Sequence, residues 1–345
     1  MIKFFKLLFF VFALFITEAK AYEFKKINHL FDSIENEFIS QPNFRTISMA
    51  GLDILNKVDK DIKIFYNKNR AFLYAKNNLI MNFDLPQTKD CLSWKNLINE
   101  ILNISMKHSN KLLIHKEEIE LKILDVCSQN VDKYSRITKE DTTTTTSYFE
   151  YNIENNVLYV KSMDFFDGFA FLLKDIITNN PSVDGLVLDL RQNRGGNFNE
   201  ALKTADLFLD EALITYATLK NNNKKYYTST SGDILNGKKI VILTSEQTAS
   251  SAEIVTAALS EQGRATTIGT KTYGKGSVQN AYNFDNSFLY ITNALVYSPA
   301  GNLIEDNGIN PHICTGVENS CLISNKKNPN KDILMAINMI KNTIG

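Results

Sequence analysis

The stretch Gly185-Leu-Val-Leu-Asp-Leu-Arg-Gln-Asn-Arg-Gly-Gly196 decides which fold to expect. Its first six residues are almost all apolar, which is typical of a strand buried on both faces of a sheet. Similar runs occur at 157–161 and 239–244, and segments with helical apolar spacing lie between or after them, at 165–177, 199–208 and 252–260. Buried strands that alternate with helices predict βαβ units and therefore an α/β fold with a largely parallel sheet.

The chain before this region has a different pattern of apolar residues. Apolar residues at three- and four-residue spacing, such as Phe31, Ile34 and Phe38, predict helices, and alternation around residues 62–74 predicts a short hairpin. Five consecutive threonines at 142–146 are typical of a linker. We therefore expect a smaller, mainly helical domain at 22–141, a linker at 142–146 and the α/β core at 147–345. Within the core, β-rich segments at 278–282 and 288–297 precede a closing helix at 332–344.

The first 21 residues have the three parts of a secretory signal peptide. Lys3 and Lys6 precede an apolar run at 7–16, and small residues, Ala19 and Ala21, end the segment. Ten apolar residues are too few to span a bilayer, which needs about 20. We predict cleavage before Tyr22 and a mature chain that is periplasmic or otherwise exported, without stable membrane insertion. The alternative is an uncleaved N-terminal anchor.

Charge and cysteine content narrow the classes of function. Lys and Arg together number 38, as do Asp and Glu, so no basic excess favours nucleic acid. In an oxidising compartment Cys314 and Cys321, which flank a six-residue loop with one glycine, are expected to form a disulfide. Cys91 and Cys127 are candidates for a second pair, although four cysteines allow three connectivities. The cysteines and the scattered histidines have no metal-ligand spacing, so we expect neither a metal nor another cofactor.

Two segments of the core place chemically useful groups after buried strands. Ligands of open α/β sheets bind beyond the carboxyl ends of strands, where Gly195 and Gly196 expose backbone N–H groups suited to an oxyanion. Ser250, with Glu253 three residues later, has the pattern of a capping box at a helix N-terminus, where the helix dipole favours negative charge. Each segment alone is more often a turn or a helix cap than a catalytic site.

A third segment, Thr272-Tyr-Gly-Lys-Gly-Ser-Val-Gln279, carries a lysine between two glycines. Small neighbours allow close packing around the amine of Lys275, and burial lowers the pKa of a lysine toward that of a general base. Gln279 is placed to orient this amine. Alone, the segment is more often a glycine-rich turn with a solvated lysine. Together with Ser250 it predicts a Ser–Lys dyad, which needs no histidine.

These segments resemble peptidase family S41, the C-terminal-processing or tail-specific proteases, over roughly residues 152–313. Gly263-Arg-Ala265, Gly308-Ile-Asn-Pro-His-Ile313 and the three segments above follow the order of that family. The resemblance implies a crotonase- or ClpP-like core in which Ser250 is the nucleophile, Lys275 the base and Gln279 its orienting partner. It also implies an oxyanion hole near Gly195 and Gly196, completed by the amide of Ser251. Ser251 ranks second as nucleophile because the spacing to Lys275 is then 24 rather than 25.

The predicted function is that of an exported serine endopeptidase that cleaves protein or peptide substrates through an acyl-enzyme. A homo-oligomer is compatible with this prediction. Relatives usually carry a PDZ domain, and no Gly-Asp-x-Ile signature of one occurs here, whereas Val131-Asp-Lys-Tyr-Ser-Arg136 is similar to another segment of the family. One alternative is a catalytically weak or inactive binding protein on the same scaffold. Another is a crotonase-like domain acting on thioesters, for which the sequence offers no acyl-carrier site.

Overall fold

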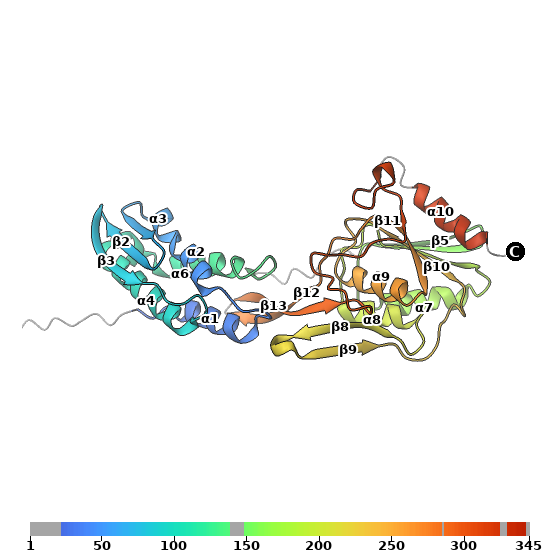
Figure 1. The fold of residues 1–345 in the computed structure, drawn as a ribbon, viewed down its shortest axis with the longest axis horizontal. Coiled ribbons are helices and arrows are strands. Elements are labelled where there is room, and N and C mark those ends of the chain that lie inside the picture. The colour runs from blue at the N-terminus through green and yellow to red at the C-terminus, as the bar shows by residue number, and fades with distance from the viewer. Residues whose placement is uncertain (1–21, 139–147, 285, 325–329, 343–345) are drawn as a thin grey trace, which may run out of the picture. The chain divides into compact units, whose positions relative to one another are not determined.

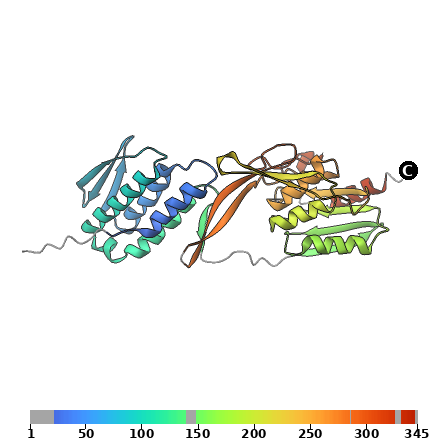
Figure 2. The same cartoon turned by 90° about the horizontal axis from the view of Figure 1, so that it is seen from below.

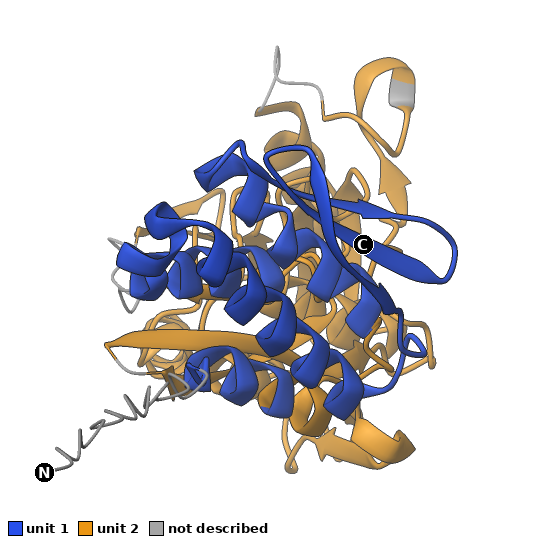
Figure 3. Cartoon of the chain, turned by 90° about the vertical axis from the view of Figure 1, so that its left-hand side faces the viewer, with its two compact units in different colours: residues 1–32, 44–127 blue, residues 33–43, 128–345 orange. Residues whose placement is uncertain are grey.

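The computed structural model describes residues 22–138, 148–284, 286–324 and 330–342. The chain forms two compact units (Figure 3): unit 1 consists of Met1–Asp32 and Phe44–Cys127, and unit 2 of Ser33–Asn43 and Ser128–Gly345. The predicted signal peptide and the threonine run lie outside the described residues. Unit 1 ends before residue 141, the boundary expected from the sequence, because residues 136–138 pair with a strand of unit 2.

Unit 1 is mainly helical, as its apolar spacing predicted. Its helices are α1 (Lys25–Glu37, whose end belongs to unit 2), α2 (Phe44–Leu52), α3 (Ile54–Val58), α4 (Cys91–His108), α5 (Asn110–Ile114) and α6 (Lys116–Gln129, whose last two residues belong to unit 2). The apolar stripe of α4 is buried around Trp94, which is fully enclosed and donates its indole N–H to the Gln87 carbonyl. A buried Trp that satisfies its one polar group is a strong anchor for a helical core.

A small antiparallel sheet completes unit 1. Strands β1 (Ile62–Tyr66) and β2 (Arg70–Ala75) form the predicted hairpin, and β3 (Asn78–Asp84) adds a third strand beside β2. Cys91 and Cys127 do not form the second disulfide that the sequence left open. The Cys91 thiol donates to the Phe31 carbonyl and the Cys127 thiol to the Ile47 carbonyl.

Unit 2 contains the largely parallel sheet. Its strand order is β14-β11-β10-β7-β6-β5, and only β5 runs antiparallel to its neighbour. The strands are β5 (Phe149–Glu154), β6 (Val157–Ser162), β7 (Gly185–Asp189), β10 (Lys239–Thr244), β11 (Ala265–Gly269) and β14 (Ile313–Cys314). Every residue of β7 is buried, which explains why its sequence is almost continuously apolar.

Helices cover both faces of this sheet (Figure 1). Helices α7 (Phe169–Asn179), α8 (Phe198–Asp206) and α9 (Ser251–Glu261) share one apolar core with the sheet, and α10 (Asn330–Lys341) packs in a second core on the opposite face. Helix α7 begins four residues later than predicted. Gly168 caps it with φ +89°, while Phe165 is held in an extended bridge to Gly196.

A second, antiparallel sheet belongs to the same unit (Figure 2). Its path is β12-β13-β8-β9, and β4 pairs with residues 288–290 of β13, whereas β8 pairs with residues 294–297. The strands are β4 (Arg136–Thr138), β8 (Leu213–Leu219), β9 (Lys224–Thr228), β12 (Ser277–Phe284) and β13 (Ser287–Tyr297). Residues from early in the chain contact it, because the Ile39 N–H donates to the Thr292 carbonyl and the Tyr282 hydroxyl donates to Glu37.

The expected disulfide between Cys314 and Cys321 is confirmed. The two Cα atoms lie 4.8 Å apart, within the range that a disulfide requires, and the bond closes the loop after β14. Among the residues that the structure describes, none of the helices combines the length and the apolar character that crossing a bilayer requires.

Candidate active site

The loop after β7 is tied to the loop that carries Ser250. Asn193 is fully buried, and its backbone carbonyl accepts the N–H of Ala249 at 3.0 Å, while its side-chain oxygen accepts the N–H of Gly195 at 2.8 Å. Two further bonds join the loops, from the Thr248 hydroxyl to the Leu190 carbonyl and from the Ser245 hydroxyl to the Arg191 carbonyl. The segment from β10 to α9 is therefore fixed on the carboxyl end of β7.

Gly195 and Gly196 cannot carry side chains in this arrangement. Both have positive φ, +108° and +130°, which only glycine adopts without strain. A Cβ on Gly195 would lie 2.8 Å from the Cβ of Ser250, and one on Gly196 would lie 2.6 Å from the backbone of Phe165. The structure thus brings Gly195 next to Ser250, which is 55 residues later in the sequence.

Ser250 precedes the first residue of α9 in a strained conformation. Its φ and ψ are +57° and −122°, a region that residues with a side chain rarely occupy and that clusters at functional sites. Ser250 is partly exposed, whereas its neighbour Ser251 is buried and donates its hydroxyl to the Gly196 carbonyl. Accessibility therefore favours Ser250 over Ser251 as the nucleophile.

Backbone donors lie around Ser250. The N–H of Gly195 is already bonded to Asn193, so it is occupied in this structure. In the described chain no acceptor is recorded for the N–H of Gly196 or of Ser251. The first N–H groups of a helix have no acceptor within the helix, and the N-terminus of a helix carries a partial positive charge. The N–H of Ser251 is therefore suited to bind an anion.

The carboxylate of Glu253 joins the Ser250 loop to the Lys275 loop. One oxygen, Oε2, accepts the N–H of Ser250 and the N–H of Lys275, both at 2.8 Å. The other, Oε1, accepts the Gly274 N–H at 2.7 Å and the Thr272 hydroxyl at 2.5 Å. Burial raises the pKa of Glu253, and the four hydrogen bonds oppose this by stabilising the charged form. The sequence pattern indicated only a helix cap at this residue.

The amine of Lys275 lies in a partly buried environment with charges of both signs. Burial is the main reason that its pKa falls below the usual lysine value, and the nearby Arg136 cation lowers the pKa further. Glu305 and Glu253 act in the opposite direction. The ring of Tyr134 lies under the amine, with 5.2 Å between Nζ and the ring centroid. A lowered pKa increases the neutral fraction of the amine, which is the form that accepts a proton.

Gln279 lies on β12, at an irregularity in its pairing with β13. Its side-chain N–H₂ donates to the hydroxyls of Ser277 and Thr292, both at 3.1 Å, which leaves its carbonyl oxygen as an acceptor. In the described part of the chain no hydrogen bond joins the Lys275 amine to Ser250 or to Gln279. The structure shows instead that Ser250 and Lys275 are attached to one carboxylate through their backbones.

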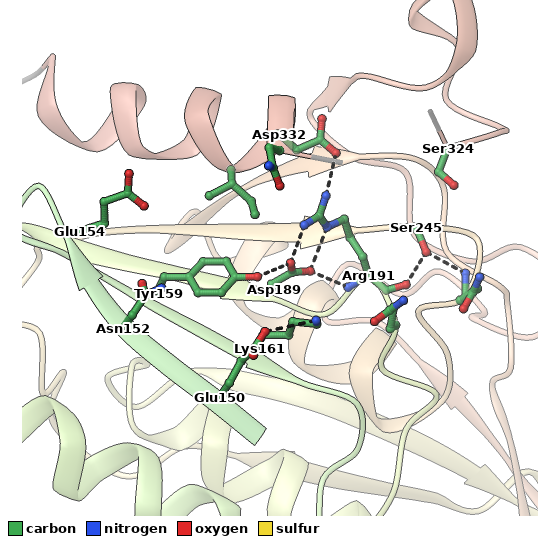
Figure 4. Close-up of a pocket in the computed structure, with 14 residues that line it drawn as sticks. Glu150, Asn152, Glu154, Tyr159, Lys161, Asp189, Arg191, Ser245, Ser324 and Asp332 are labelled. Carbon is green, nitrogen blue, oxygen red and sulfur yellow. Dashed lines mark hydrogen bonds and ion pairs between the residues drawn. The ribbon is translucent and has the colours of Figure 1, made fainter. Parts of the chain in front are cut away.

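A polar cavity of about 660 Å³ lies near the same strand ends but contains none of the predicted catalytic residues (Figure 4). Within it, Arg191 binds Asp189 through two nitrogens, at 3.0 and 2.6 Å, and approaches Asp332 of α10 at 3.5 Å. Tyr159 donates its hydroxyl to Asp189 at 2.8 Å. This buried network fixes the start of the loop that leads to Gly195, and sequence reasoning did not assign it a role.

Metal-ligating groups do not gather at these residues. Among the residues that the structure describes, no group of three His, Cys, Asp or Glu side chains at metal-binding distances includes a residue of the Ser250 and Lys275 loops. The arrangement offers a strained serine, a partly buried amine and two backbone donors. These are the parts that acyl transfer requires.

Comparison with known proteins identifies relatives of the core. Residues 156–315 match the model of the family described as Peptidase family S41. A carboxy-terminal-processing protease of Bartonella bacilliformis is 36% identical over 172 residues, which are 48% of this chain and 40% of that protein. A probable CtpA-like serine protease of Staphylococcus haemolyticus is 27% identical over 328 residues, which are 86% of this chain and 65% of that protein. The chain thus covers less than two thirds of either relative.

A solved structure shares the fold over most of the chain. It is a lipoprotein from Streptococcus agalactiae, with a TM-score of 0.54 and 18% sequence identity over 90% of this chain and all of that one. At this identity the likeness concerns the fold alone. It agrees with the α/β core that the strand pattern of residues 157–244 predicted.

Proposed function

We propose that the chain, whose residues 156–315 match the model of peptidase family S41, is an exported serine endopeptidase that cleaves protein substrates through a Ser250–Lys275 dyad. The observation that carries the proposal is the carboxylate of Glu253, which accepts the backbone N–H of both Ser250 and Lys275. Two residues 25 positions apart are thereby held on one rigid group at the carboxyl end of the sheet.

The reaction follows from the groups around Ser250. Neutral Lys275 accepts the hydroxyl proton as Oγ attacks the scissile carbonyl, and the N–H groups of Gly196 and Ser251 stabilise the oxyanion. The protonated amine then gives this proton to the leaving nitrogen, so that the C–N bond breaks and an acyl ester remains on Ser250. Water, deprotonated by the neutral Lys275, attacks the ester; the C–O bond to Oγ breaks, Oγ takes the proton back from the amine, and the acid is released. Gln279 orients the amine through its carbonyl oxygen, and Gly195 provides space against Ser250.

The alternative is a binding protein on the same scaffold. The absence of a recorded bond between the Lys275 amine and Ser250 in the described chain is the feature that favours it. In enzymes without bound substrate, hydrogen bonds between catalytic groups are often long and shorten only when substrate binds. The missing bond is therefore compatible with a peptidase.

Labelling with a fluorophosphonate and cleavage of an unfolded protein substrate distinguish the two functions. A peptidase reacts with the probe at Ser250 and cleaves the substrate, and Ser250→Ala or Lys275→Ala abolishes both reactions. The double variant loses hardly more than either single one, because groups that act as a unit are non-additive. Ser260→Ala, on the same helix with its hydroxyl bonded to the Ala257 carbonyl, is the matched control. A folded wild-type chain that neither reacts nor cleaves is the binding protein.

Export and substrate choice belong to the same proposal. The pattern of residues 1–21 supports cleavage before Tyr22, and an exported chain that still begins at Met1 on N-terminal sequencing would contradict it. Without a PDZ signature we expect weak discrimination between a free and an amidated substrate C-terminus. A large preference for the free carboxylate would contradict that expectation.

A further inference from the structure

The segment before β4 places an aromatic ring against the candidate base. The ring centroid of Tyr134 lies 5.2 Å from Nζ of Lys275 and 5.1 Å from Nζ of Lys133. The Lys133 amine also interacts with the Tyr134 side chain through a hydrogen bond. Contacts of the neighbouring backbone fix the position of this ring.

Local hydrogen bonds hold the Tyr134 backbone firmly. One carboxylate oxygen of Asp132 accepts the N–H of Tyr134 at 3.0 Å and that of Ser135 at 2.6 Å, which closes a tight turn. Arg136 donates from Nη1 to the Tyr134 carbonyl at 3.0 Å. The next residues pair with β13, where Arg136 lies opposite Tyr290. A rigid turn docked on a strand thus sets the position of the ring.

We propose that Tyr134 is a positioning residue for Lys275: its ring face holds the charged amine between proton transfers and keeps it beside the nucleophile loop. The proposal rests on the assignment of Lys275 as base. A cation over the face of an aromatic ring within about 6 Å is attracted by the quadrupole of the ring. The ring adds this attraction without adding a hydrogen-bond acceptor that would compete with Ser250 for the amine.

The other groups that face the amine are charged. Arg136, on β4, lowers the pKa of Lys275, while Glu305 and Glu253 raise it, and the second cation on the same ring, Lys133, approaches Asp306 at 3.5 Å. Burial raises the pKa of Tyr134, so the ring stays a neutral phenol when Lys275 titrates. Substitutions of Tyr134 that leave all these charged residues in place therefore measure the effect of the ring alone on the pKa of Lys275.

The test measures the pKa of Lys275 directly in the full chain, by NMR of ¹³C-labelled lysine with Lys275→Arg to identify the signal. Tyr134→Phe keeps the ring and is expected to leave the midpoint unchanged. Tyr134→Leu keeps the site apolar but removes the ring face, so the charged amine loses stabilisation and the midpoint falls by about half a pH unit. Tyr134→Met serves in its place if the Leu variant does not fold.

A matched control is Tyr273→Leu. The ring of Tyr273 lies 5.2 Å from Nζ of Lys133 and has no recorded cation contact with Lys275 in the described chain, so the midpoint should stay. An unchanged or raised midpoint in Tyr134→Leu, or a shift in Tyr134→Phe, overturns the proposal. The NMR result does not depend on hydrolysis. A chain with the expected shifts but no peptidase activity therefore refutes the proposed function alone, and an active chain without them refutes only the role of Tyr134.

Discussion

At the scale of single residues, two charges of opposite sign control the Lys275 amine from fixed positions. Arg136 lowers the pKa of the amine and Glu305 raises it, although burial is the larger influence. Glu305 also accepts the N–H of Gly276 at 2.8 Å. The side-chain oxygen of a glutamine at this position can accept the same bond. Changes at these two residues should therefore move the pH dependence of activity in opposite directions.

We expect activity to rise with pH through the lowered pKa of Lys275, because only the neutral amine accepts the serine proton. At an ordinary lysine pKa roughly 0.04% of the amine is neutral at pH 7. Arg136→Met removes a cation, so the pKa rises and the midpoint of kcat/KM moves to higher pH. Glu305→Gln removes an anion, so the midpoint moves to lower pH. Shifts in the same direction for both variants would contradict the electrostatic explanation.

Glu253 provides a second prediction at this scale. Glu253→Gln places an N–H₂ group where one carboxylate oxygen accepted N–H groups, so donors face donors. We expect kcat to fall about 100-fold, as small displacements of catalytic groups do, and the free energy of unfolding to fall by about 1–3 kcal/mol. Glu246→Gln is the control, because Glu246 bonds Ser324 and Thr270 instead. Wild-type kcat in the Glu253 variant would exclude a positioning role.

The sequence indicated Ser250, Lys275 and their glycine neighbours because these lie in short segments with unusual composition. It gave no indication that Glu253 bonds the Lys275 loop, since a capping box explains the glutamate locally. It also gave no indication of what Tyr134 and Asn193 contact. Their contacts with Lys275 and Ala249 join residues 141 and 56 positions apart, and no local pattern predicts such contacts.

At the scale of elements, the glycine turn between β7 and α8 constrains the loop that carries Ser250. Gly195→Ala adds a Cβ at 2.8 Å from the Cβ of Ser250 in a backbone region that alanine disfavours. We expect kcat/KM to fall by about 100-fold or more, because Ser250, the proposed nucleophile, must move. Gly232→Ala is the control that separates backbone strain from contact with Ser250. Gly232 also has a positive φ, +114°, but an added Cβ there would have no atom within 4 Å. Equal losses in both variants would assign the effect to backbone strain.

The elements buried on both faces were those that the sequence predicted best. Residues 239–244 form β10 as expected, and β6 and β7 also match, because continuous apolar runs report burial directly. Strands β8 and β9 were not predicted. Thr215 and Thr218 interrupt the apolar pattern of β8, and β9 is mostly exposed. Their place in the sheet depends on the pairing of β8 with β13, about 80 residues later. The pairing of β4 with β13 depends on a still longer separation.

At the scale of the whole molecule, the disulfide contributes to the stability of unit 2. A disulfide that closes a loop of about eight residues lowers the entropy of the unfolded chain, which stabilises the folded state by roughly 2.5 kcal/mol. The double variant Cys314→Ser, Cys321→Ser should lower the Tm by about 5–10 °C, as calorimetry of the full chain measures. Reduction of the wild-type protein should have the same effect. An unchanged Tm in both experiments would show that the covalent link is not needed to keep the loop folded.

The bonds from Glu37 and Ile39 to β12 and β13 have a consequence for synthesis. Tyr282 and Glu37 are 245 residues apart, and ribosomes add about 5–20 residues per second. The early segment therefore waits on the order of 10–50 s for its partner strands. Ser250 leaves the ribosome before Lys275, and both leave before Thr292, whose carbonyl binds Ile39. A growing chain thus carries Ser250 before it has the complete antiparallel sheet, so we expect the candidate site to be complete only after residues 277–297 have been made.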